Sequence, residues 1–76
     1  MNRNQYNLVE PHRYYWEALE KTGSIDNIPE SVLLTFQNVA GQILDVKYNL
    51  ACKNCVIEMI QFLGLRFKKY EQSIEA

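Results

Sequence analysis

The sequence predicts a small all-α domain, a three-helix domain in which a short first helix packs on a longer antiparallel helix pair. Apolar residues recur at helical three- and four-residue spacing in three successive segments, and no segment shows the alternation typical of a half-buried strand. The chain has 76 residues, of which 47% are hydrophobic. It is therefore long enough for one domain and too apolar for a disordered chain.

The chain divides into an arm, a domain and a tail. Residues 1–10 are interpreted as a polar N-terminal arm, because asparagine and glutamine dominate them. A single helical domain is expected over 11–72, and a tail over 73–76. The first helix is predicted at 11–22. Pro11 is expected in its first turn, because the backbone N–H that proline lacks would have no hydrogen-bond partner there.

The second predicted helix begins at Pro29, and Asp26 and Asn27 are expected to cap it. Gly23 is expected to end the first helix, with its backbone in the left-handed conformation. Gly41, inside the second helix, is interpreted as a point of close approach by another helix. The apolar stripe of this helix continues to about position 47 with 4-3-4-3 spacing: Val32, Phe36, Val39, Ile43 and Val46.

A turn is expected at 48–51. Without it, a single helix from Pro29 to the last apolar residues of the chain would exceed about 40 residues, far beyond the usual length in globular proteins. Asn49 is the residue there that best tolerates a left-handed conformation. The third helix is then predicted over about 52–72. Large apolar residues lie off its core stripe as well as on it, so more than half of its circumference is apolar.

This excess of apolar helix surface is the main functional signal. A small helical domain normally buries one face of each helix, and a larger contiguous apolar surface marks a contact with a partner. We therefore expect a small non-enzymatic protein–protein interaction module that acts as a homo-oligomer or as a component of a larger assembly. Its partner-binding residues are predicted to be Tyr14, Trp16, Ile57, Phe62 and Leu65.

Cys52 and Cys55 form a Cys-x-x-Cys motif at the expected start of the third helix. Three interpretations stay open: two reduced thiols, a reversible or fortuitous disulfide, and a metal site. Zinc would need four ligands, and the chain offers these two cysteines and the lone His12, so an acidic side chain or a second copy would have to complete the site. A thioredoxin-type enzyme is not expected, because no strand precedes the motif.

Arg66, Lys68 and Lys69, near the end of the third helix, are the candidate nucleic-acid contacts. The simpler interpretation is that these cations stabilise the helix dipole at its C-terminal end. A net charge of −1 argues against a general polyanion binder. Nucleic acid is therefore not the expected partner.

Neither an enzyme nor a membrane protein is expected. The carboxylates show no paired spacing, the glycines are isolated, and no serine lies in a nucleophile elbow. No apolar run reaches the roughly 18 residues that cross a bilayer, and the first residues do not resemble a secretory signal. Two cysteines are too few for a secreted disulfide scaffold, so a cytoplasmic location is expected.

Two short motifs flank the second predicted helix: Asp26-x-Ile28-Pro29 and Asn49-x-x-Cys52-x-x-Cys55-x-x-Glu58. Over residues 24–71 the chain resembles small uncharacterised helical Cys-x-x-Cys proteins of phages and mobile elements of Bacteroides-like bacteria. The resemblance implies a viral or mobile-element accessory protein, in the host cytoplasm or in the virion if it is phage-encoded, with no catalytic residue. Two alternatives to the assembly role are a phage inhibitor that blocks a host defence or host enzyme by steric occlusion, and a small nucleic-acid-binding regulator.

Overall fold

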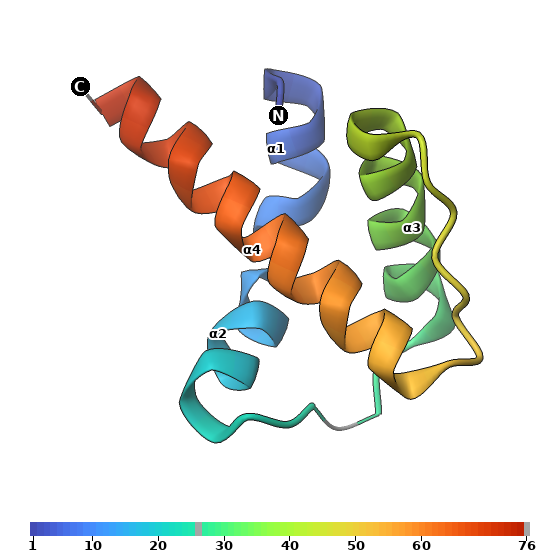
Figure 1. The fold of residues 1–76 in the computed structure, drawn as a ribbon. Coiled ribbons are helices and arrows are strands. Elements are labelled where there is room, and N and C mark those ends of the chain that lie inside the picture. The colour runs from blue at the N-terminus through green and yellow to red at the C-terminus, as the bar shows by residue number, and fades with distance from the viewer. Residues whose placement is uncertain (26, 76) are drawn as a thin grey trace.

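The computed structural model describes residues 1–25 and 27–75, which form four α-helices and one short 3-10 helix. The elements are α1 (Arg3–Val9), η1 (Glu10–His12), α2 (Arg13–Thr22), α3 (Glu30–Leu44) and α4 (Lys53–Glu75), as Figure 1 shows. These residues contain no strand, so the predicted all-α class is confirmed.

The N-terminal segment is a helix, which corrects the expectation of a polar arm over 1–10. Asn2 and Gln5 form a capping box, in which Asn2 Oδ1 accepts the Gln5 N–H at 2.8 Å and Gln5 Oε1 accepts the Asn2 N–H at 2.9 Å. Val9 is fully buried, and the Gln5 amide donates to Gln42 of α3 at 3.1 Å. α1 is therefore an integral part of the domain.

α1 and α2 follow one another, and the chain bends between them (Figure 1), at the short η1 segment that contains Pro11. Proline supplies no N–H, and its ring clashes with the carbonyl four residues earlier, so α1 ends at Val9. The 3-10 turn over Glu10–His12 takes up the bend, and α2 begins at Arg13. Gly23 ends α2 with φ 74°, in the left-handed conformation that the sequence predicts.

α3 ends earlier than its apolar stripe suggests. Asp45 takes the left-handed conformation (φ 56°) that we expected at Asn49, and the helix stops at Leu44. A short side chain with a hydrogen-bonding oxygen makes this conformation accessible to either residue. Val46 and Lys47 consequently lie in a connector and not on the helix.

The connector, residues 45–52, returns along α3, so α3 and α4 do not form the expected antiparallel pair. Gln37 Nε2 donates to the Tyr48 carbonyl at 2.8 Å and holds the returning chain against the helix. Leu33 near the start of α3 and Val56 near the start of α4 line the same cavity. Figure 1 shows the two helices starting at the same end of the molecule, with α4 then crossing it obliquely.

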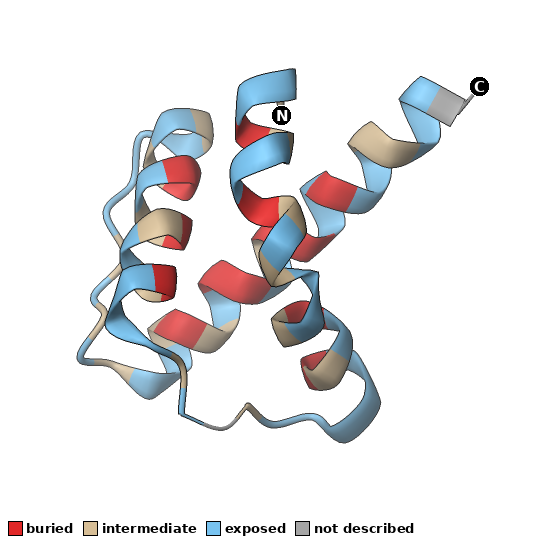
Figure 2. Cartoon of the chain, turned by 180° about the vertical axis from the view of Figure 1, so that it is seen from behind, coloured by how far each residue is buried: buried red, intermediate tan, exposed pale blue. Residues whose placement is uncertain are grey.

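The core lies where α4 crosses the other helices, and the buried residues in Figure 2 face this crossing. The Trp16 ring lies 4.9 Å from Phe67 and 6.1 Å from Phe36, measured between ring centroids. Tyr6 of α1 stacks on Phe67 at 4.7 Å. The apolar stripe predicted for the third helix supplies the buried side of α4: Val56, Met59, Ile60, Leu63 and Phe67.

Of the two glycines inside helices, Gly64 is the one that another helix approaches closely, not Gly41 as we expected. A Cβ atom built on Gly64 would lie 2.9 Å from Trp16 Cβ, well inside van der Waals contact. A Cβ on Gly41 would meet the carbonyl oxygen of Val46 in the connector at an ordinary 3.7 Å. The absence of a side chain at Gly64 therefore sets how deeply α2 packs on α4.

Two predicted boundaries also change. α4 continues to Glu75, so the tail expected at 73–76 is helical up to that residue. Pro29 directly precedes α3 and, among the described residues, no side chain makes a capping hydrogen bond there. Asn27 is therefore not the cap that we expected, and the cap expected at Asp26 lies outside the described residues.

Candidate functional site

The three consecutive aromatic residues of α2 lie at three different depths. Trp16 is only 2% exposed, so the prediction that it is a surface anchor is wrong. It is buried because α4 presents Gly64 to it and lets the two helices approach closely. Tyr14 is 69% exposed, as a contact residue would be, and Tyr15 is half-buried with its ring edge-on to Phe36 at 6.2 Å.

The other predicted contact residues lie on α4. Ile57 is half-buried and packs against the core, so it offers a partner little area. Phe62 is also half-buried, and the Arg66 guanidinium lies over its ring at 5.3 Å from the centroid. Leu65 is the most exposed of the three, at 64%. Phe62 packs against the core as Ile57 does, so Leu65 is the exposed apolar candidate on the outside of α4, with the half-buried Phe62 beside it.

We define the outer seam of α4 by four residues: Glu58, Phe62, Leu65 and Lys69. Their spacing of four, three and four positions places them along one side of the helix. This side is turned away from the buried stripe of the same helix, and the two charged members are exposed. The seam thus carries an apolar centre with one carboxylate before it and one ammonium group after it.

A groove between α2 and α4 lies beside the seam. Its volume is about 290 Å³, and an ion pair between Lys68 and Glu20 joins the two helices next to it. The sequence did not indicate this groove, because it exists only where α2 crosses α4. It is lined by Trp16, Leu19, Glu20, Gln61 and Leu65.

The three basic residues proposed for nucleic acid do not all lie on one side of α4. Lys68 pairs with Glu20 of α2, Arg66 lies over the Phe62 ring, and Lys69 belongs to the outer seam. Residues three apart on an α-helix are neighbours, so Arg66 and Lys69 lie on the same side of α4, whereas Lys68 is turned toward α2. The helix also continues past them, so they do not lie in its last turn as the dipole interpretation required.

Cys52 caps the N-terminus of α4. Its carbonyl accepts the Val56 N–H at 3.0 Å, and its Sγ accepts the Cys55 N–H at 3.3 Å. Hydrogen bonds from the Cys55 thiol and from the backbone N–H groups of Cys55 and Asn54 lower the pKa of Cys52. The bond to Cys52 and burial raise the pKa of Cys55. Both thiols are free and half-buried.

His12 does not join the two cysteines. Its ring lies 5.8 Å from Phe36 and 6.5 Å from Tyr15, measured between ring centroids, at the edge of the aromatic core. Within the described part of the chain, no three His, Cys, Asp or Glu side chains are grouped so that they could hold a metal ion. Zinc shared by the cysteine pairs of two copies stays a hypothesis.

We expect Cys52 to be alkylated by iodoacetamide faster than Cys55 at neutral pH, because the thiolate is the nucleophile and Cys52 has the lower pKa. Cys55 is protonated first as the pH falls, so the preference should be largest and constant below both pKa values and should shrink once the pH exceeds both. Timed alkylation with peptide mass spectrometry measures this ratio. Cys55→Ala should slow the reaction of Cys52, and equal rates at every pH would contradict the assignment.

The helices of the described residues and the comparisons with known proteins assign no function to this chain. In the described ranges, no helix combines the length and the apolar character needed to cross a membrane. Comparison with family models, with curated proteins and with solved structures gave no match for the chain. The function therefore has to follow from the geometry of the chain itself.

Proposed function

We propose that the protein is a non-enzymatic protein–protein interaction module whose contact surface is the outer seam of α4 together with the α2–α4 groove. The exposure of Leu65 carries the proposal. This large apolar side chain is 64% exposed on the outside of the helix that forms the core with its other side. Covering it with a partner would gain about 25 cal/mol for each Å² of apolar surface removed from water.

The surroundings of Leu65 support a contact with a protein. Phe62 lies one helical turn away on the same side, and the groove beside Leu65 can receive an apolar side chain of a partner. Charged residues of the seam, Glu58 and Lys69, lie at its two ends, which matches the apolar centre and polar rim of protein interfaces. Because these residues lie on a helix, little backbone entropy is lost when they are covered.

A phage-encoded assembly component and a steric inhibitor of a host enzyme are both specific forms of this module, and both stay predictions. Regulation by nucleic-acid binding is less well supported. Lys68 is engaged with Glu20, and Arg66 covers Phe62 on the seam itself. Binding to a phosphate backbone would need Arg66, Lys68 and Lys69 to be unpaired on one common surface.

The test is association measured by size-exclusion chromatography with light scattering over a concentration series. Wild-type protein is expected to associate as its concentration rises, and Leu65→Gln is expected to weaken this association about tenfold through lost apolar burial. Leu34→Gln is the matched control, because Leu34 is 49% exposed on α3, away from the seam. A Leu65→Gln variant that associates like wild type, or an equal loss in the Leu34 variant, would overturn the proposal.

A further inference from the structure

We infer that the partner on this surface is a second copy of the chain, docked antiparallel along α4. This inference rests on the proposed function and adds the identity and the orientation of the partner. It is carried by the order of residue types along the outer seam. Glu58 precedes the apolar pair formed by Phe62 and Leu65, and Lys69 follows it at the same spacing.

The seam is complementary to itself when it is reversed. In an antiparallel copy turned about the middle of the seam, Phe62 lies beside Leu65 of the second copy. The same rotation brings Glu58 beside Lys69 of the second copy. Each contact occurs twice, because a two-fold axis repeats every pair. Steps of four, three and four residues follow the 3.6-residue turn of an α-helix, so the four side chains stay on one side of α4.

The charges select this arrangement over its alternatives. A parallel pair would set Glu58 against Glu58 of the second copy and Lys69 against Lys69, which places like charges opposite each other. Sliding an antiparallel pair by four residues would separate both the apolar pair and the ion pairs. A slide of three residues would set Phe62 against Phe62 and Glu58 against Arg66 of the second copy, and would leave Lys69 without its partner. The net charge of each chain is only −1, so general repulsion between copies is weak.

The contact is small, which predicts a reversible dimer. α4 has 23 residues, a length of about 34 Å at 1.5 Å per residue. One helix from each copy, with the flank of α2 along the groove, provides an interface at the lower end of the specific range, below about 1,200 Å². We therefore expect a dissociation constant in the micromolar range.

Charge reversal at the two ends of the seam tests the inference. Glu58→Lys and Lys69→Glu are each expected to raise the dissociation constant about tenfold, since each creates two repulsive pairs in place of two attractive ones. An equimolar mixture of the two variants should regain the wild-type affinity, because every facing pair is again of opposite charge. The double variant, with the charges exchanged, should also dimerise like wild type.

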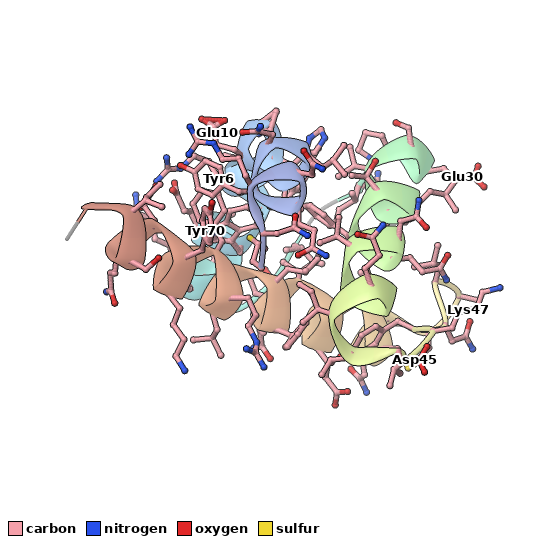
Figure 3. All side chains as sticks on the ribbon, turned by 90° about the horizontal axis from the view of Figure 1, so that it is seen from above. Tyr6, Glu10, Glu30, Asp45, Lys47 and Tyr70 are labelled. Atoms are coloured by element: carbon pink, nitrogen blue, oxygen red, sulfur yellow. The ribbon has the colours of Figure 1, made fainter. Side chains whose placement is uncertain are left out.

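Glu30→Lys and Lys47→Glu are the matched controls. They make the same changes in charge at exposed positions on the α3 side of the molecule, away from α4 (Figure 3). Neither should change the dissociation constant measured by sedimentation equilibrium. Thermal melting of every variant checks that the protein is folded, so that a change in the dissociation constant is not caused by unfolding.

The outcomes separate the inference from the proposed function. If Leu65→Gln weakens association while both charge reversals leave it unchanged, the antiparallel seam is wrong and the interaction module stands. If the single reversals weaken association and the mixture does not recover it, the two residues do not face each other and the inference fails. If wild-type protein stays monomeric at every concentration, the inference fails, and the interaction module needs a different protein as its partner.

Discussion

Replacement of Trp16 by alanine is expected to unfold much of the population of the domain, and not merely to weaken a contact with a partner. The indole is 2% exposed and packs against the rings of Phe67 and Phe36. Truncating a buried tryptophan costs about 3–5 kcal/mol of stability. At 0.05–0.15 kcal/mol per residue, a chain of 76 residues has a total stability of only about 4–11 kcal/mol.

Urea denaturation followed by far-ultraviolet circular dichroism measures this loss, since Trp16 is the only tryptophan and its fluorescence disappears with it. Tyr14→Ala on the same helix is the matched control. Tyr14 is 69% exposed, so its truncation should change the free energy of unfolding by no more than about 0.5 kcal/mol. A stable Trp16→Ala chain that associates poorly would restore the surface role predicted from the sequence.

The helices could be predicted from apolar spacing, but their relative directions could not. Val46 fits the stripe of α3, yet the helix ends before it because Asp45 turns left-handed. That turn sends the connector back along α3, where the Gln37 side chain holds the Tyr48 carbonyl. A hydrogen bond between residues eleven positions apart leaves no periodic pattern in the sequence, so this return of the chain could not be predicted.

Composition did not predict α1, although the spacing of its first residues indicates a helix start. The segment is rich in asparagine, and composition alone suggested an arm. Asn2 and Gln5 nevertheless have the spacing of a capping box, and Tyr6 and Val9 follow at positions that share one side of a helix. The spacing of residues was more informative here than their average polarity.

The site could be predicted in part. Phe62 and Leu65 lie off the core stripe of α4, so their outward position follows from helical geometry. Which of the aromatic residues at 14–16 enters the core could not be derived, because it depends on the rotation of α2 relative to α4. Gly64 determines that rotation through its contact with Trp16, and the sequence offered no sign of which helix Gly64 faces.

Gly64→Ala is expected to destabilise the domain even though alanine is the better helix former. The added Cβ would lie 2.9 Å from Trp16 Cβ and 3.0 Å from Trp16 Cγ. Both atoms are close to the α2 backbone, so the indole cannot rotate away and α2 itself has to move. Overpacking of this kind costs about 1–3 kcal/mol, against a gain of at most about 1 kcal/mol from helix propensity.

Gly41→Ala is the matched control, because Gly41 is also inside a helix but its Cβ would make only an ordinary 3.7 Å contact with the connector. This variant should gain up to about 1 kcal/mol in the free energy of unfolding, so the two glycine substitutions should change stability with opposite signs in the same urea titration. A Gly64→Ala chain that is stabilised like Gly41→Ala would mean that Trp16 and α2 shift without cost. The α2–α4 crossing, and with it the groove beside Leu65, would then not be set by that contact.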